Sequence, residues 1–122
     1  MASRFTELII DSNDPPSIAE FWSKVLDYEV SDTSDQEVEL KGPGDGPTLL
    51  FVKVPEDKQV KNRVHMDLNA TDRSQQEEVD RILALGATPA DVGQKDVKWV
   101  VLADPEGNEF CVLSSRVKPL AK

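Results

Sequence analysis

Hydrophobic and polar positions in the first half of the chain predict a strand, a helix and three further strands. Residues 5–11 are predicted as a strand, with Leu8 and Ile10 on an apolar face and Glu7, Ile9 and Asp11 on a mixed face. Residues 15–26 repeat apolar side chains at the three- and four-residue spacing of an amphipathic helix. Asp14 is suited to cap this helix, and Pro15 suits its first turn. The three strands that follow are predicted at residues 28–32, 36–41 and 48–54.

The second half of the chain repeats this order of elements. Residues 63–70 alternate in the manner of a strand. Ser74 and Glu77 have the spacing of a capping box at the start of a helix, and Gly86 is placed to end that helix. The strands predicted after it lie at residues 88–92, 97–103 and 109–114.

The repeated order predicts an α+β fold of two βαβββ modules within a single domain of 122 residues. Module one covers about residues 4–54 and module two about residues 63–115. The polar stretch at about 55–62 is expected to link them. Each helix must cover the apolar face of its own sheet, so the helices are expected on the outside of a cupped mixed sheet.

One face of the strand predicted at residues 63–70 is polar, because Arg63, His65 and Asp67 share it. The alternate positions on the other face are apolar: Val64, Met66 and Leu68. A polar face of this kind predicts a polar-lined cavity or a solvent-exposed sheet face. In a cavity, His65 suits acid–base chemistry near neutral pH, and Arg63 suits a bound carboxylate or phosphate. The alternative for Arg63 is an ion pair with Asp67 or Glu7.

Two shifts align the halves of the chain. A shift of 58 residues superposes Glu7 on His65, and a shift of 61 superposes Leu50 on Cys111. The difference between the two shifts indicates a loop-length change between the modules. We therefore expect these four residues to occupy matching positions on the first and last strands of their modules.

Composition narrows the classes of partner. The formal net charge of −9 argues against nucleic acid and against an anionic membrane surface, since both require a basic face. No apolar run approaches the roughly 18 residues of a membrane span, and no signal peptide is recognisable. The single cysteine excludes an internal disulfide framework. A cytoplasmic location is expected.

Several short motifs, taken in order, resemble one known group of proteins. They are Ile10-Asp11, Asp14-Pro15, Phe21-Trp22, residues 61–68 (KNRVHMDL), residues 85–88 (LGAT) and residues 104–110 (DPEGNEF). This set resembles the vicinal oxygen chelate superfamily of glyoxalase I, extradiol dioxygenases, fosfomycin-resistance enzymes and bleomycin-binding proteins. It resembles most closely the bacterial glyoxalase-like domain group.

The resemblance implies a divalent metal site built from the first and last strands of each module. Carried over by position, its ligands are Glu7, Leu50, His65 and Cys111. Leu50 has no donor atom, and Cys111 offers a thiolate where the superfamily usually has a carboxylate. The site is therefore incomplete, and the cofactor stays open between no metal and a divalent metal held by Glu7 and His65.

The resemblance leaves three functions open. The first is a small-molecule-binding protein, metal-free or with a weakened metal site, in which His65 and Glu7 carry acid–base chemistry. The second is a metal-dependent lyase, isomerase or dioxygenase, and the third is a drug-sequestering protein of the bleomycin-resistance kind. The other residues expected to contact the ligand are Arg63, Asp67, Leu50, Cys111 and Trp99. The superfamily also suggests a homodimer as one option.

Overall fold

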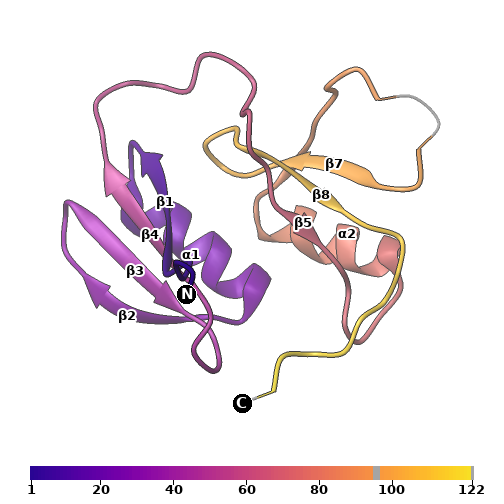
Figure 1. The fold of residues 1–122 in the computed structure, drawn as a ribbon. Helices are drawn as coiled ribbons and strands as arrows, with labels where there is room; N and C mark the ends of the chain where they lie inside the picture. Colours follow the sequence, from indigo (N-terminus) through magenta and orange to yellow (C-terminus); the bar gives the residue numbers. More distant parts are fainter. Residues whose placement is uncertain (95–96, 122) are drawn as a thin grey trace. The chain divides into compact units, whose positions relative to one another are not determined.

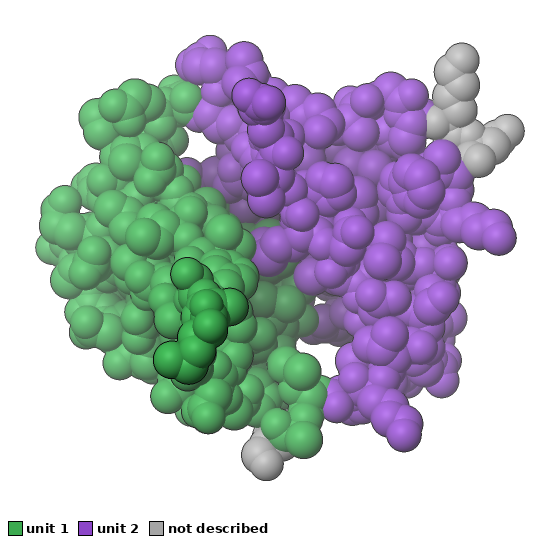
Figure 2. Space-filling view, in the orientation of Figure 1, with its two compact units in different colours: residues 1–57, 120–122 green, residues 58–119 purple. Residues whose placement is uncertain are grey.

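The computed structural model describes residues 1–94 and 97–121, and it has the predicted order of elements in both halves (Figure 1). The chain divides into two compact units (Figure 2). Unit 1 comprises Met1–Asp57 with Leu120–Lys122, and unit 2 comprises Lys58–Pro119. Each unit contains one βαβββ module, so the predicted α+β fold of two such modules is confirmed.

Unit 1 is a four-stranded mixed sheet with one helix. Its elements are β1 (Glu7–Ser12), α1 (Pro15–Leu26), β2 (Glu29–Thr33), β3 (Glu37–Lys41) and β4 (Thr48–Lys53). The strand order is β1-β4-β3-β2. β1 lies parallel to β4, and the other neighbouring pairs are antiparallel. The crossover that parallel pairing requires carries the helix, as the βαβ rule demands.

Both ends of α1 follow from local sequence. The side chain of Asp14 accepts a hydrogen bond from the backbone N–H of Ser17 at 3.4 Å, and Pro15 begins the helix. Asp27 ends it in the left-handed conformation, with φ of 56°. The N–H of Tyr28 then donates to the carbonyl of Ser23. These contacts satisfy groups that a helix end leaves open.

The apolar stripe of α1 forms the core of unit 1 against its sheet. Ile18 and Trp22 on the helix, and Leu40 and Phe51 on the strands, are at most 1% exposed. Removing each such side chain from water stabilises the fold by about 1.5–3 kcal/mol. Trp22 is therefore a core residue, and its ring meets that of Phe21 edge to face at 5.2 Å.

Unit 2 has the same topology with shorter strands. Its elements are β5 (Asp67–Leu68), α2 (Gln75–Leu85), β6 (Thr88–Pro89), β7 (Val100–Ala103) and β8 (Glu109–Val112). The order is β5-β8-β7-β6, and β5 lies parallel to β8. Phe110 and Val112 of β8 are at most 1% exposed, and Ile82 of α2 is fully buried.

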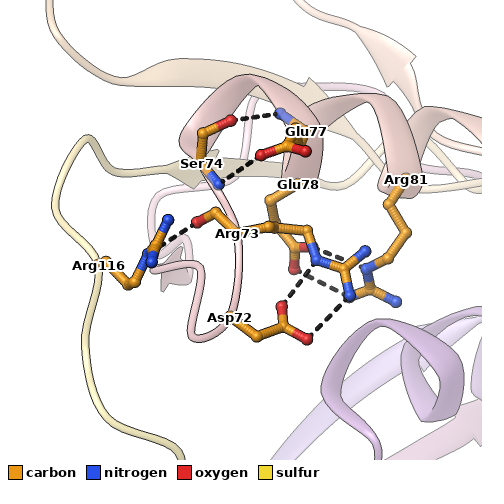
Figure 3. A network of polar contacts seen from close by, with 7 residues as sticks. All are labelled: Asp72, Arg73, Ser74, Glu77, Glu78, Arg81 and Arg116. Carbon is orange, nitrogen blue, oxygen red and sulfur yellow. Dashed lines mark hydrogen bonds and ion pairs between the residues drawn. The ribbon is translucent and has the colours of Figure 1, made fainter.

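The start of α2 is fixed by a polar network, drawn in Figure 3. The predicted capping box is present: Ser74 accepts from the N–H of Glu77, and the Glu77 carboxylate accepts from the N–H of Ser74, both at 3.1 Å. The carboxylate of Glu78 accepts two hydrogen bonds from Arg81, at 2.7 and 2.9 Å. Arg116, near the end of the unit, donates to the carbonyl of Arg73 and so ties the tail to this loop.

The strand predicted at residues 63–70 is shorter than expected, because β5 comprises only Asp67 and Leu68. Val64, predicted on the helix-covered face, is 76% exposed. The reason is the register, in which Asp67 lies beside Cys111. Two-residue steps back along both strands bring residue 63 opposite Gly107, which lies in the turn closed by its N–H bond to the Asp104 carbonyl. The first part of the predicted strand therefore has no partner strand.

Two other strands of unit 2 also begin late or end early. The predicted strand at 88–92 is observed as Thr88–Pro89, and that at 97–103 as Val100–Ala103. Trp99 therefore lies in the bend before β7 and is 44% exposed.

The internal repeat predicted from the two shifts is confirmed by strand register. In unit 1 the parallel strands place Ile9 beside Leu50, and in unit 2 they place Asp67 beside Cys111. Ile9 and Asp67 differ by 58 residues, and Leu50 and Cys111 by 61. The two shifts therefore describe equivalent places in two separate sheets.

The helices can also be compared with the length and hydrophobicity that a membrane-spanning helix needs. Across residues 1–94 and 97–121, neither helix offers the long apolar run that crossing a bilayer requires.

Candidate functional site

The candidate site is a cavity on the sheet of unit 2. Cys111 lines it, and the register places this residue beside Asp67 of β5 on one side and Val101 of β7 on the other. Side chains at alternate positions of a strand share a face. Glu109 and Leu113 therefore flank Cys111 on the face away from the buried Phe110 and Val112.

The cavity has a volume of about 250 Å³. Its walls combine apolar and polar side chains. The apolar lining residues are Val92, Trp99, Val101 and Leu113. The polar and ionisable lining residues are Lys61, His65, Asp67, Glu109 and Cys111. A small concave site with mostly apolar walls and a few convergent polar groups is the usual form of a ligand pocket.

Three of the ionisable side chains form a close cluster. Nε2 of His65 lies 3.2 Å from Oδ1 of Asp67. With Sγ of Cys111 they supply three donor atoms that all lie within 4.8 Å of one another. His65 and Asp67 are solvent-accessible, with side chains 42% and 50% exposed, whereas Cys111 is buried. The cluster is therefore open to solvent at His65 and Asp67 and shielded from solvent at Cys111.

Glu109 fastens the segment before β5 to the sheet. Its carboxylate accepts a hydrogen bond from Nζ of Lys58 at 2.9 Å and another from the N–H of Asn62 at 3.0 Å. The side chains of Lys58 and Glu109 are only 21% and 14% exposed. Nδ2 of Asn62 also donates to Asn108 at 3.3 Å. These contacts hold Lys61 at the edge of the cavity.

The surroundings change the acidity of two cavity side chains. Burial would raise the pKa of the Glu109 carboxyl, but the bonds from Asn62 and Lys58 outweigh it and leave this pKa below its ordinary value. Burial raises the pKa of the Cys111 thiol. The charge of Asp67 adds to that increase, and the charge of Lys61 opposes it. Cys111 is thus held in its protonated form.

The structure brings together four of the residues predicted from sequence: His65, Asp67, Cys111 and Trp99 all line the cavity. Arg63 is exposed and is not among the described residues that line it. Glu7 and Leu50 belong to unit 1, where the carboxylate of Glu7 accepts a hydrogen bond from Thr48 Oγ1 at 3.1 Å. The roles expected for Glu7 and Leu50 stay predictions.

Sequence reasoning did not assign Val92, Val101, Glu109 or Leu113 to the site. For two of them a signal was present, because Glu109 and Leu113 stand two positions before and after Cys111 on a predicted strand. Val101 lines the cavity because β7 lies beside β8, a strand order that the sequence alone does not reveal. Val92 lies in a bend after β6. Lys61 belongs to the motif at residues 61–68, but sequence reasoning gives it no role in the site.

A family model for the glyoxalase-like domain matches residues 7–113. The chain belongs to this family. The resemblance to the glyoxalase-like domain group, suggested by the motifs, is thereby confirmed. None of the curated proteins is similar enough in sequence to count as a relative.

Solved structures show the same fold. One is a glyoxalase/bleomycin resistance protein/dioxygenase family enzyme from Burkholderia phytofirmans PsJN, with 19% identity, a TM-score of 0.66 and coverage of 90% of this chain and 97% of that one. Another is the fosfomycin resistance protein FosX from Listeria monocytogenes, with 15% identity, a TM-score of 0.73 and coverage of 96% and 97%. FosX from Mesorhizobium loti is 15% identical, with a TM-score of 0.67 and coverage of 96% and 95%. At these identities the likeness establishes the glyoxalase-like fold alone.

The metal that the superfamily implies does not fit the residues at the four matching positions. Leu50 supplies no donor, and its neighbour on β1 is Ile9. The unit 2 cluster offers a different set, one nitrogen, one oxygen and one sulfur. That set suits a soft tetrahedral ion such as zinc with one open position, and less well an octahedral ion that prefers oxygen.

Proposed function

We propose that this glyoxalase-like protein binds a small organic molecule in the cavity of unit 2 and that binding needs no divalent metal. The observation that carries the proposal is the cavity itself, about 250 Å³ with apolar walls and an ionisable cluster at one place. Leu50 removes one ligand of the superfamily's metal site, so a metal-independent role needs fewer assumptions.

The size of the cavity favours a small ligand. Pockets for drug-sized molecules have volumes of about 300–1,000 Å³, so this one suits something smaller. A mutant FosX has been solved with manganese and 1S,2S-dihydroxypropylphosphonic acid, itself a small molecule. The alternative of sequestering a large drug draws less support from this cavity.

His65 is the residue best suited to chemistry in the site. Its Nε2 lies 3.2 Å from Oδ1 of Asp67, a contact that orients the imidazole. We propose that His65 exchanges a proton with the ligand and that Asp67 positions it. The earlier prediction gave the partner role to Glu7, and Asp67 is the partner that lies in contact.

The first test is a small-molecule screen by two-dimensional NMR on chelator-treated protein. We expect shifts confined to the backbone and indole signals of cavity residues such as Val92, Trp99 and Val101. Trp99→Ala should weaken the hits, whereas Phe5→Ala, an exposed aromatic in unit 1, should leave them unchanged. Hits that map away from the cavity, or equal losses in both variants, would contradict the proposal.

A second candidate function is metal-dependent chemistry, and the cluster of His65, Asp67 and Cys111 specifically favours it. Bonds of about 2.0–2.3 Å to one zinc ion require the three donors to draw slightly closer than 4.8 Å. Rotation of the exposed His65 and Asp67 side chains would achieve this. The superfamily reactions open to such a site are those of a lyase, isomerase or dioxygenase.

Cobalt(II) binding separates the two candidates. If the cluster holds a metal, cobalt should give a thiolate-to-metal absorption band that Cys111→Ser abolishes and that His65→Gln weakens. Elemental analysis of the freshly purified protein should then find about one zinc per chain. Ligand binding that survives chelation, with no cobalt band, supports the metal-independent function.

A further inference from the structure

Some charged side chains in the unit 2 cavity already have a partner of opposite charge within the protein, and others do not. Besides the thiol of Cys111, four lining side chains carry or can carry a charge: Lys61, His65, Asp67 and Glu109. A ligand is recognised best by a charge that the protein itself leaves without a counter-ion, because forming that contact breaks no existing ion pair. The partners of each group therefore indicate which charge is available.

Glu109 is fully engaged. Lys58 neutralises its charge at 2.9 Å, and the N–H of Asn62 occupies its second oxygen at 3.0 Å. Both members of the ion pair are mostly shielded from water. A cationic ligand would have to displace Lys58 to reach this carboxylate, so Glu109 is unsuited to recognise one.

Asp67 also has a partner, because Nε2 of His65 lies 3.2 Å from Oδ1. This contact places the carboxylate of Asp67 directly beside the imidazole. When the imidazole is protonated, the two side chains form an ion pair. The carboxylate of Asp67 thus already has a partner in His65 and is less available to a ligand.

Lys61 is different. Its ammonium donates to the carbonyl of the adjacent Asn62 at 3.1 Å, and among the described residues no carboxylate lies within ion-pair distance of it. Its charge is felt inside the cavity, because it favours the ionised form of Cys111 while burial and Asp67 oppose that form. An ammonium has three donor hydrogens, so at least two remain for a ligand.

The remaining lining of the cavity is apolar. Val92, Val101 and Leu113 contribute aliphatic surface, and Trp99, 44% exposed, contributes an indole ring. A planar or aliphatic body fits such a wall, and the modest volume limits that body to a small one. The lining therefore favours a ligand that has a negative charge for Lys61 and an apolar body for the apolar side chains.

We propose that the ligand of this cavity is a small organic monoanion, such as an aryl or alkyl carboxylate, whose charge is bound by Lys61 and whose apolar body lies against Trp99. This inference rests on the proposed function and adds the chemical class of its ligand. It also transfers the anion-binding role expected for Arg63 to Lys61, because Arg63 is exposed and does not line the cavity.

Three probes of similar size and different charge test the inference: phenylacetate, phenylacetamide and 2-phenylethylamine. Affinities are measured by NMR titration, with the Trp99 indole signal as reporter of occupancy. We expect phenylacetate to bind more tightly than the neutral amide, and the amide more tightly than the cation. An amide that binds as tightly as the anion would overturn the anion preference and leave the proposed small-molecule function standing.

Substitutions identify the cation responsible. Lys61→Gln should weaken phenylacetate at least threefold and change phenylacetamide by less than about twofold, since an accessible charged contact is of that strength. Lys118→Gln removes the same charge from an exposed position of unit 2 outside the cavity and should change neither.

Two further outcomes also decide the matter. If Arg63→Gln weakens phenylacetate while Lys61→Gln does not, Lys61 is not the anion-binding group and the inference is wrong. If none of the three probes shifts the cavity signals of the folded wild-type protein, the proposed function and the inference both fail.

Discussion

At the scale of single residues, the surroundings of Cys111 determine the reactivity of its thiol. A thiol acts as a nucleophile only as thiolate, and low-pKa thiols sit near positive charge or a helix N-terminus. Cys111 is only 7% exposed, and burial together with Asp67 raises its pKa despite Lys61 nearby. The expected reading is an unreactive thiol that fills the floor of the cavity.

The reaction of Cys111 with a thiol reagent tests this reading. In chelator-treated protein, we expect the native thiol to react at least tenfold more slowly at pH 8 than the urea-unfolded chain. The pH midpoint of the native rate should lie above the ordinary value of about 8.5, because the pKa is raised. Asp67→Asn should lower that midpoint. A native midpoint below 8.5 would show an activated cysteine instead.

Glu109 provides a second prediction at this scale, through its bonds to Lys58 and Asn62. Glu109→Gln removes the charge of a mostly shielded ion pair and should cost about 1–3 kcal/mol of unfolding free energy at pH 7. Urea denaturation measures the loss. Glu29→Gln, on the exposed strand β2, serves as the control and should lie within about 0.5 kcal/mol of wild type.

The pH dependence of that loss has a defined sign. The folded-state pKa of Glu109 is lowered, so its stabilisation is present above the unfolded pKa of about 4.3 and is lost as pH falls through the folded value. The difference between wild type and Glu109→Gln should therefore be constant near neutral pH and shrink below about pH 4. A difference that grows toward acid pH would contradict the assignment.

At the scale of elements, α2 depends on its first turn more than α1 does. Unit 2 has shorter strands, and Ser74 and Glu77 satisfy each other's backbone N–H groups where the helix begins. Ser74→Ala should lower the unfolding free energy by about 1 kcal/mol, measured by urea denaturation. Ser114→Ala, an exposed serine in the same unit, should have no measurable effect. Equal effects would mean that the cap contributes nothing specific.

Element type and order could be predicted from the sequence, whereas strand length in unit 2 could not. The helix caps at Asp14 and Ser74 are local, so the residues beside them predict the helix starts. The extent of the first strand of unit 2 depends on a distant segment, since the register brings residue 63 opposite Gly107 in the turn at 104–108. Alternation along residues 63–70 describes side chains and says nothing of whether a partner strand is present.

The candidate site divides in the same way. His65, Asp67 and Cys111 could be singled out because their residue types are unusual on a strand face, and they do lie together. Lys61 and Glu109 owe their roles to contacts between residues far apart in the chain, such as the bond from Asn62 to Glu109. Arg63, the more obvious cation in the sequence, is exposed and is not among the described residues that line the cavity.

At the scale of the whole molecule, the two units share a topology and differ in chemistry at equivalent positions. Unit 1 has Ile9 beside Leu50 where unit 2 has Asp67 beside Cys111. The strand register is the same in both units, so the backbone accepts either pair of side chains at this position. We infer that the repeated module supplies a stable sheet in both units and that ligand chemistry is concentrated in unit 2. Fold likeness alone would have missed this asymmetry, because one fold carries many functions.

Net charge gives the last prediction. The chain carries −9 overall, which repels an organic anion at long range, while Lys61 attracts it at short range. The Debye length falls from about 30 Å at 0.01 M salt to about 8 Å at 0.15 M, so salt screens the long-range repulsion first. In Lys61→Gln only the repulsion is left, and added salt should therefore strengthen phenylacetate binding. In wild type, salt weakens the Lys61 contact as well, so the ratio of wild-type to variant affinity should fall toward one.

NMR titrations at the two salt concentrations measure this ratio, with phenylacetamide as the control that salt leaves unchanged. A ratio that does not move with salt would mean that Lys61 affects binding by shape and not by charge.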